Sequence, residues 1–130
     1  MKIIERLEDL TPDYPAPVAT IGNFDCVHLG HQNLIRDLAG RAAVIGGTPV
    51  VLTFHPHPLQ VLAPNFAPLQ IQTLGQRLSI IESLGIPLAV IIPFDMQLAQ
   101  KSARDFVVDT LWDGLRIKEI YVGPNFAFGH

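Results

Sequence analysis

Continuous apolar runs alternate with amphipathic stretches along this chain. Four runs are apolar at nearly every position, which predicts strands buried on both faces: residues 18–24, 49–54, 88–94 and 120–123. Three stretches between them have apolar residues at helical spacing: residues 32–45, 73–85 and 102–115. Strand and helix therefore alternate to a fourth strand, and this order predicts an α/β fold with a parallel sheet covered by helices on both faces.

Local signals at the helix ends support this assignment. Two helices are expected to start at capping-box patterns and two to end at glycines: the starts are Thr73 with Gln76 and Ser102 with Asp105, and the ends are Gly46 and Gly85. Residues 55–72 contain four prolines, at 56, 58, 64 and 68, and are predicted to be irregular. A loop of that length inside a compact domain is usually functional.

Ligands of parallel α/β sheets bind outside the carboxyl ends of the strands. Four loops are expected at that edge: residues 23–31, 55–72, 94–101 and 124–130. The chain has no internal repeat and no linker, so residues 1–130 are expected to form one domain.

Composition excludes several classes of partner. The 130 residues are 48% hydrophobic and 16% charged, as in a globular domain with a core. A net charge of −3 gives no basic field for nucleic acid, and no apolar run approaches the roughly 20 residues of a membrane span. Cys26 is the only cysteine, so no internal disulfide can form, and charges at Lys2 and Glu5 come too early for a signal peptide. We therefore expect a cytoplasmic protein with neither nucleic acid nor membrane as a partner.

The candidate chemistry lies where the first strand turns into the first helix. His28 and His31 are separated by Leu29 and Gly30, directly before the helical segment. Free backbone N–H groups at a helix N-terminus favour anions, phosphate above all, and two imidazoles there could stabilise charge as a bond breaks. A histidine pair alone is better explained by a surface residue and a helix cap. The apolar strand and Gly22 before the pair favour the functional interpretation.

This string resembles the signature of the nucleotidyltransferase superfamily with a His-x-Gly-His motif. Residues 21–25 and 27–32 are similar to the adenylyltransferase domain of bacterial FAD synthetases, the bifunctional riboflavin kinase/FMN adenylyltransferase family. Three later blocks resemble that family in register: residues 52–54 with 56–58; residues 93–95 with 98–99, 102–103 and 106–107; and residues 122–123 with 125–126 and 128–129. The resemblance runs from about residue 15 to the last residue. It implies a Rossmann-like fold and transfer of AMP from ATP to FMN, giving FAD and pyrophosphate.

The resemblance also implies roles for individual residues. His28 and His31 would be catalytic and contact the ATP phosphates, with Gly30 keeping the backbone open. The ATP site would further include Gly22, Asn23, Phe24, Asp25 and Asn125. The flavin site would include Phe54, Pro56, His57, Pro58, Phe126 and Phe128. In the family Mg²⁺ bridges the phosphates, and Mg²⁺ uses few protein ligands, so no carboxylate cluster is needed.

Several of these residues have a structural alternative. Asn125 follows Pro124 and could be a turn residue. Phe54, together with Phe94 and Phe106, could belong to the core. His55 and His57 could join His28 and His31 in a zinc site, but no thiolate or carboxylate has a suitable spacing, so we expect no protein-bound metal.

The chain also departs from the family pattern. Cys26 stands where glycine is usual, and Ala127 where arginine is common. The family domain continues to a Ser-Ser-Thr…Arg signature and is normally fused to a riboflavin kinase domain, and neither resembles any segment here, so we expect a C-terminally incomplete adenylyltransferase domain. The alternatives are a nucleotide-binding fragment without turnover, a related adenylyltransferase acting on phosphopantetheine or nicotinamide mononucleotide, and a protein-interaction remnant.

Overall fold

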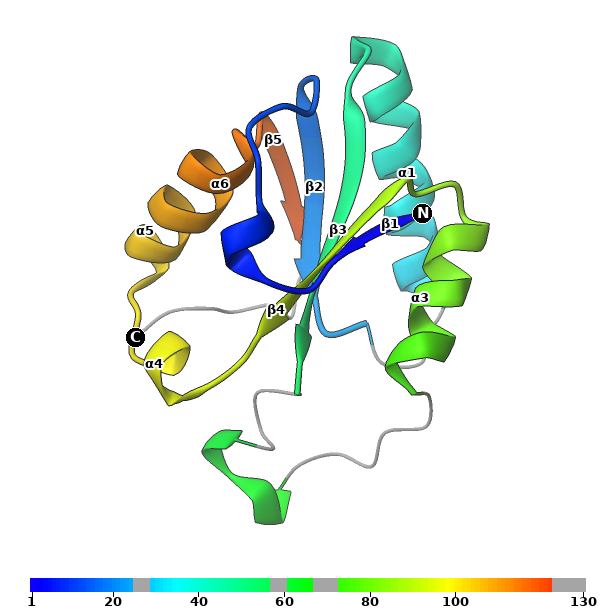
Figure 1. Cartoon of the computed structure of the whole chain (residues 1–130). Helices are drawn as coiled ribbons and strands as arrows, with labels where there is room; N and C mark the ends of the chain where they lie inside the picture. The colour runs from blue at the N-terminus through cyan, green and yellow to red at the C-terminus, as the bar shows by residue number, and fades with distance from the viewer. Residues whose placement is uncertain (25–28, 57–60, 67–72, 123–130) are drawn as a thin grey trace.

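The computed structural model describes residues 1–24, 29–56, 61–66 and 73–122 of the chain. Within these ranges five strands form one parallel sheet with the order β1-β4-β3-β2-β5 (Figure 1). The strands are β1 (Lys2–Ile4), β2 (Pro17–Gly22), β3 (Thr48–His55), β4 (Leu88–Pro93) and β5 (Glu119–Val122). The predicted parallel α/β sheet is confirmed, with β1 as an additional strand at one edge.

Helices cover both faces of this sheet (Figure 1). The helical elements are η1 (Leu7–Asp9), α1 (Leu29–Ile45), η3 (Pro64–Phe66), α3 (Leu74–Ser83), α4 (Met96–Ala99), α5 (Ala103–Phe106), the π-helical η4 (Val107–Trp112) and α6 (Asp113–Leu115). The helices α1 and α3 lie on one face, where Ile35 and Ile81 pack against Val18 of β2. On the other face, Phe106 and Leu115 pack against the sheet with η1 and α4 nearby.

Successive residues of a strand point to opposite faces of the sheet. In β2, Val18 belongs to the core under α1 and α3, and Ala19 belongs to the core on the opposite side; both are fully buried. Because each face is covered, the inner strands are apolar at consecutive positions, and this is the pattern that the sequence shows.

Most of the expected helix boundaries are confirmed. The Thr73 hydroxyl accepts from the Gln76 amide at 3.1 Å, and the Gln76 side chain accepts from the Thr73 amide at 2.8 Å, which completes the capping box. Ser102 caps the next helical stretch, but residues 107–112 of that stretch are π-helical rather than α-helical. The expected start of the first helix at residue 32 was wrong, because α1 begins at Leu29. No helix in the described ranges is long and apolar enough to cross a membrane.

The strand order reverses between β2 and β5. The chain passes from β2 to β3 to β4 in one direction, and then crosses to β5 on the far side of β2. The two strands are in register, with Ile21 beside Val122. In open α/β sheets the crevice that binds ligands lies at such a reversal, outside the carboxyl ends of the strands. The segments that leave β2 and β5 therefore start next to each other.

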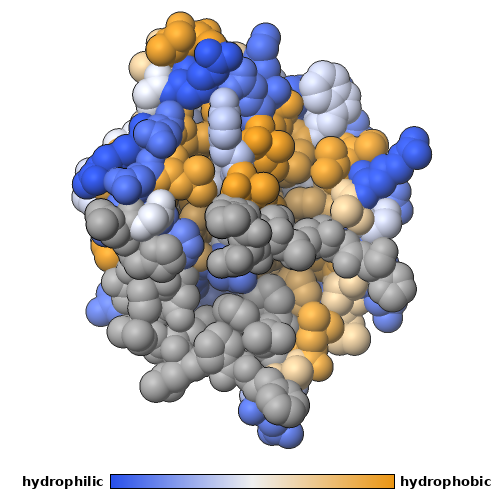
Figure 2. Space-filling model, turned by 180° about the vertical axis from the view of Figure 1, so that it is seen from behind, coloured by the Kyte–Doolittle hydropathy of each residue, from blue (hydrophilic) through white to orange (hydrophobic). Residues whose placement is uncertain are grey.

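The strand β5 is an edge strand with exposed side chains. Ile120, Tyr121 and Val122 are 43%, 39% and 49% exposed. Seen from behind, the molecule shows hydrophobic surface interspersed with hydrophilic residues (Figure 2).

Candidate functional site

The turn between β2 and α1 carries the sequence signature. Its described part consists of Gly22, Asn23 and Phe24 on one side and the first residues of α1, including Gly30 and His31, on the other. The first four N–H groups of an α-helix have no acceptor within the helix, so the start of α1 can donate to an anion. The sequence places His28 directly before that helix.

Phe24 has an unusual conformation at this turn. Its φ is +52°, in the left-handed region, and only 3% of its surface is exposed. The ring meets the imidazole of His31 edge to face, with centroids 5.1 Å apart and an angle of 78° between the rings. A Cβ at Gly22 would lie 3.2 Å from the same ring, so this glycine leaves room for Phe24. The ring of Phe24 therefore packs against His31 just beyond the end of β2.

Two side chains that sequence analysis missed hold the carbonyl of Asn23. The Arg77 guanidinium donates from α3 to this oxygen, and the Thr53 hydroxyl donates to it from β3 at 3.1 Å. Arg77 is 2% exposed. The signal was an arginine within the apolar stripe of α3, next to Leu78. The side-chain oxygen of Asn23 is buried and finds no hydrogen-bond partner in the described part of the chain.

Seven of the proposed site residues lie outside the described residues: Asp25, His28, His57, Pro58, Asn125, Phe126 and Phe128. Their roles stay predictions, as do the effects of Cys26 and Ala127. The structure still relates two of these segments, because residue 25 comes three positions after the end of β2 and residue 125 three positions after the end of the adjacent β5.

Phe54 lies in the core. It is 2% exposed, and its ring meets the rings of Phe94 and Phe106 at centroid distances of 5.8 and 6.5 Å. The structural alternative for all three phenylalanines is thus confirmed. A contact between Phe54 and a flavin stays a prediction, as does one from Pro56, which follows β3.

A hollow of about 640 Å³ opens at the carboxyl end of β4. The charged residues of its lining are Arg6, Glu8, Asp95 and Lys101. The Asp95 carboxylate also caps α4 by accepting from the Leu98 amide at 2.8 Å. The hollow is on the same edge of the sheet as the β2–α1 turn. Within the described ranges, no three metal-ligating side chains come together.

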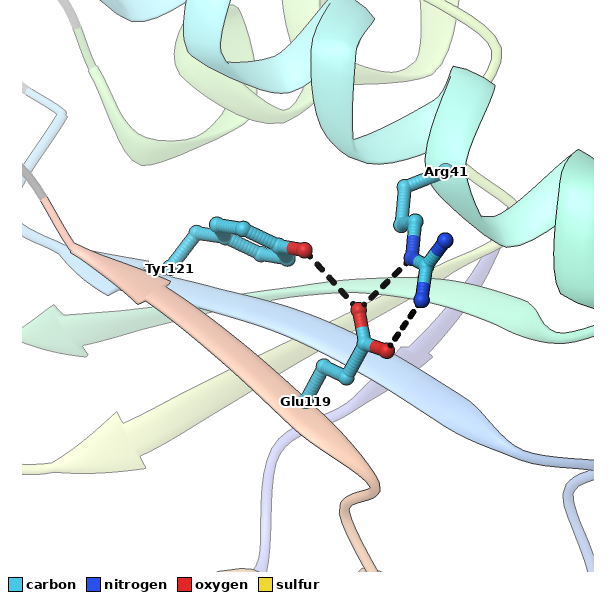
Figure 3. A network of polar contacts seen from close by, with 3 residues as sticks. All are labelled: Arg41, Glu119 and Tyr121. Carbon is cyan, nitrogen blue, oxygen red and sulfur yellow. Dashed lines mark hydrogen bonds and ion pairs between the residues drawn. The ribbon is translucent and has the colours of Figure 1, made fainter.

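An ion pair joins the C-terminal part of α1 to the first residue of β5, away from the β2–α1 turn (Figure 3). Arg41 donates from Nε and Nη2 to the two carboxylate oxygens of Glu119 at 2.9 and 2.8 Å, and the Tyr121 hydroxyl donates to the same carboxylate at 2.8 Å. These hydrogen bonds from Arg41 and Tyr121 lower the pKa of Glu119 to about 2. The bond to Glu119 raises the pKa of Tyr121. This ion pair thus joins α1, which contains His31, to β5, which precedes Asn125 in the sequence.

The sequence profile of the FAD synthetase family matches residues 11–130. The chain belongs to this family. FAD synthetase membership agrees with the fold, because the motif residues lie where the strand order reverses. Among similar proteins are the bifunctional riboflavin kinase/FMN adenylyltransferases of Pseudomonas fluorescens, 35% identical over 129 residues, and of Escherichia coli K12, 34% identical over 133 residues.

These FAD synthetase relatives are much longer than this chain. The alignments cover 99% of the chain but only 41% and 42% of the two relatives, so the chain spans about two fifths of their length. A crystal structure from Streptococcus pneumoniae, described as a macrolide-efflux protein, is similar with a TM-score of 0.85 and 28% identity. That alignment covers 99% of this chain and 44% of the other.

Proposed function

We propose that this chain carries the FMN adenylyltransferase activity of FAD synthetase, transferring AMP from ATP to FMN with release of pyrophosphate. The observation that carries the proposal is the position of the β2–α1 turn at the reversal of the strand order, beside the end of β5. The family membership and the relatives named for this activity support it. The proposal concerns the adenylyltransferase alone and assigns no kinase activity to these residues.

In the proposed reaction a phosphate oxygen of FMN attacks the α-phosphorus of ATP. A P–O bond forms to the α-phosphate, the bond between the α-phosphorus and the bridging oxygen breaks, and pyrophosphate leaves with the electron pair. The FMN phosphate is already anionic at neutral pH, so no general base is required. The main task of the protein is to stabilise negative charge with preorganised donors. We assign this task to His28, His31 and the N–H groups at the start of α1.

The remaining site residues are proposed to hold the two nucleotides. Gly22, Asn23, Phe24 and Asp25 would form the wall of the ATP site, and Asn125 would reach it from the end of β5. Mg²⁺ bound to ATP would supply neutralisation of phosphate charge. The described part of the chain has no cluster of three metal ligands. Mg²⁺ commonly keeps several waters and uses few protein ligands, so this role does not require a cluster of protein carboxylates. We also propose a cytoplasmic location, which a single cysteine fits.

The test is formation of FAD from FMN and ATP with Mg²⁺, measured by liquid chromatography for the chain and for His28→Ala and His31→Ala. Asp37→Ala, a change at an exposed position of the same helix, is the matched control. We expect FAD from the chain and from the control, and a loss of about 100-fold or more when either histidine is removed, as for one preorganised donor in other enzymes.

Absence of FAD from the chain itself would overturn the proposal for these residues. Calorimetry with ATP and Mg²⁺ would then distinguish the alternatives. Binding without turnover would indicate a nucleotide-binding fragment, which the two-fifths coverage of the relatives makes the main rival.

A further inference from the structure

Arg77 is a charged residue at a position facing the core. It lies in α3 next to Leu78 and is 2% exposed. Arginine is not deprotonated in proteins, so the charge is retained when the side chain is buried. Burying a charge is costly unless the charged group is well hydrogen-bonded. The groups that accept hydrogen bonds from Arg77 therefore indicate its role.

One acceptor of the Arg77 guanidinium is the carbonyl oxygen of Asn23, the first residue after β2. The Thr53 hydroxyl donates to the same oxygen at 3.1 Å. A carbonyl oxygen has two lone pairs, and here a donor from α3 and a donor from β3 both engage it. Two separate elements thus hold the peptide group at which the chain leaves the sheet.

The peptide group between Asn23 and Phe24 determines the direction in which the backbone continues into Phe24. The peptide is planar, so fixing the Asn23 carbonyl also fixes the direction of the Phe24 N–H. Phe24 then has a φ of +52°, a conformation that a residue with a Cβ keeps only when its surroundings impose it. Its ring contacts the imidazole of His31, with centroids 5.1 Å apart. A continuous series of contacts therefore leads from Arg77 to His31.

We infer that Arg77 is a positioning residue of the nucleotide site: it holds the carbonyl of Asn23 so that Phe24 keeps the His31 imidazole in place for the phosphates of ATP. The inference rests on the proposed function, in which His31 contacts those phosphates. Arg77 itself acts through Asn23 and Phe24. The conservative Arg77→Lys change keeps the positive charge and a hydrogen-bond donor. It should therefore retain most of the His31 position and of the ATP affinity that Arg77→Met loses.

Two measurements test this role. One is the NMR signals of the His31 ring, which lie within reach of the Phe24 ring current, and the other is calorimetric affinity for ATP with Mg²⁺. We expect Arg77→Met to shift the His31 signals and to weaken ATP binding by about tenfold, because a displaced His31 would lose about one charge-assisted hydrogen bond to a phosphate. We expect Arg77→Lys to bind within about threefold of the unchanged chain. Arg104→Met, at an exposed position, removes the same charge and should change neither readout.

Each outcome decides the inference. If Arg77→Met folds and leaves both the His31 signals and the ATP affinity unchanged, the inference is wrong. If Arg77→Met does not fold, Thr53→Val removes the other donor to the same oxygen, and no change in either readout overturns the inference. If the unchanged chain does not bind ATP, the proposed function fails, and the His31 signals still show whether Arg77 positions this ring.

Discussion

Replacing Phe24 by alanine and by glycine separates two properties of this residue, its buried ring and its left-handed backbone. Both variants lose a ring that is 3% exposed, and this loss costs about 3–5 kcal/mol of unfolding free energy. The two variants differ only in the Cβ. At a φ of +52° the Cβ costs about 1–2 kcal/mol, whereas glycine loses about 0.5–1 kcal/mol more backbone entropy on folding. We therefore expect Phe24→Gly to be more stable than Phe24→Ala by about 0.5–1 kcal/mol.

Position 40 provides the matched control. Gly40 lies inside α1, and a Cβ there would have no other atom within 4 Å. In a helix alanine is favoured over glycine, so Gly40→Ala should raise the stability by about 1 kcal/mol. Glycine should thus give the more stable protein at position 24, and alanine should give the more stable protein at position 40.

The assay is unfolding in urea followed by circular dichroism, with linear extrapolation of the unfolding free energy to water. A result in which Phe24→Ala is more stable than Phe24→Gly, by the margin found at position 40, would refute the left-handed geometry of the turn. The argument for Phe24 as a fixed support of His31 would then fail as well.

Three further perturbations test other parts of the structure. The pKa of Glu119 is about 2 against an ordinary value of 4.5, so the stability that its ion pair contributes is complete above pH 4.5 and lost as the pH falls towards 2. Glu119→Gln should therefore make the Tm less dependent on pH over that window, and an unaltered pH dependence of the Tm would contradict this. Thr73→Ala removes the capping box and should cost about 1 kcal/mol, seen as a lower urea midpoint, with an equal midpoint as the contrary result. A Cβ at Gly47 would lie 2.3 Å from the backbone oxygen of Ala16, so Gly47→Ala should lower stability by about 1–3 kcal/mol, and a Tm at or above that of the unchanged chain would speak against the close approach.

The central strands were predictable from sequence because they are long and covered on both sides. The strands β2, β3 and β4 have six, eight and six residues, enough for a continuous apolar run to be distinct. The strand β1 has three residues, of which only Ile4 is buried, so it shows no period. The π-helical turn at residues 107–112 was not predicted either, because a single sequence does not show whether a backbone N–H bonds to the carbonyl four or five residues before it.

The candidate site likewise has a part that the sequence predicts and a part that it does not. Its motif is contiguous in sequence, so the sequence alone could propose the turn after β2 as the place of the chemistry. Its support is not contiguous: Thr53 and Arg77 reach Asn23 from 30 and 54 residues away. Contacts of this kind depend on how α3 and β3 pack against the turn. A single sequence shows no more of them than an arginine where a hydrophobic residue is expected.

The pairing of β2 with β5 has a consequence for how the protein folds. Its partners, such as Ile21 and Val122, are further apart in the sequence than the partners of any other strand pair in the described sheet. The entropy lost on closing a loop grows with its length, and non-local contacts slow folding. The pairings of β2 with β3 and of β3 with β4 join residues that are closer together in the sequence, so the docking of β5 is expected late. ATP affinity should then appear late in refolding experiments, after most of the helical signal has returned.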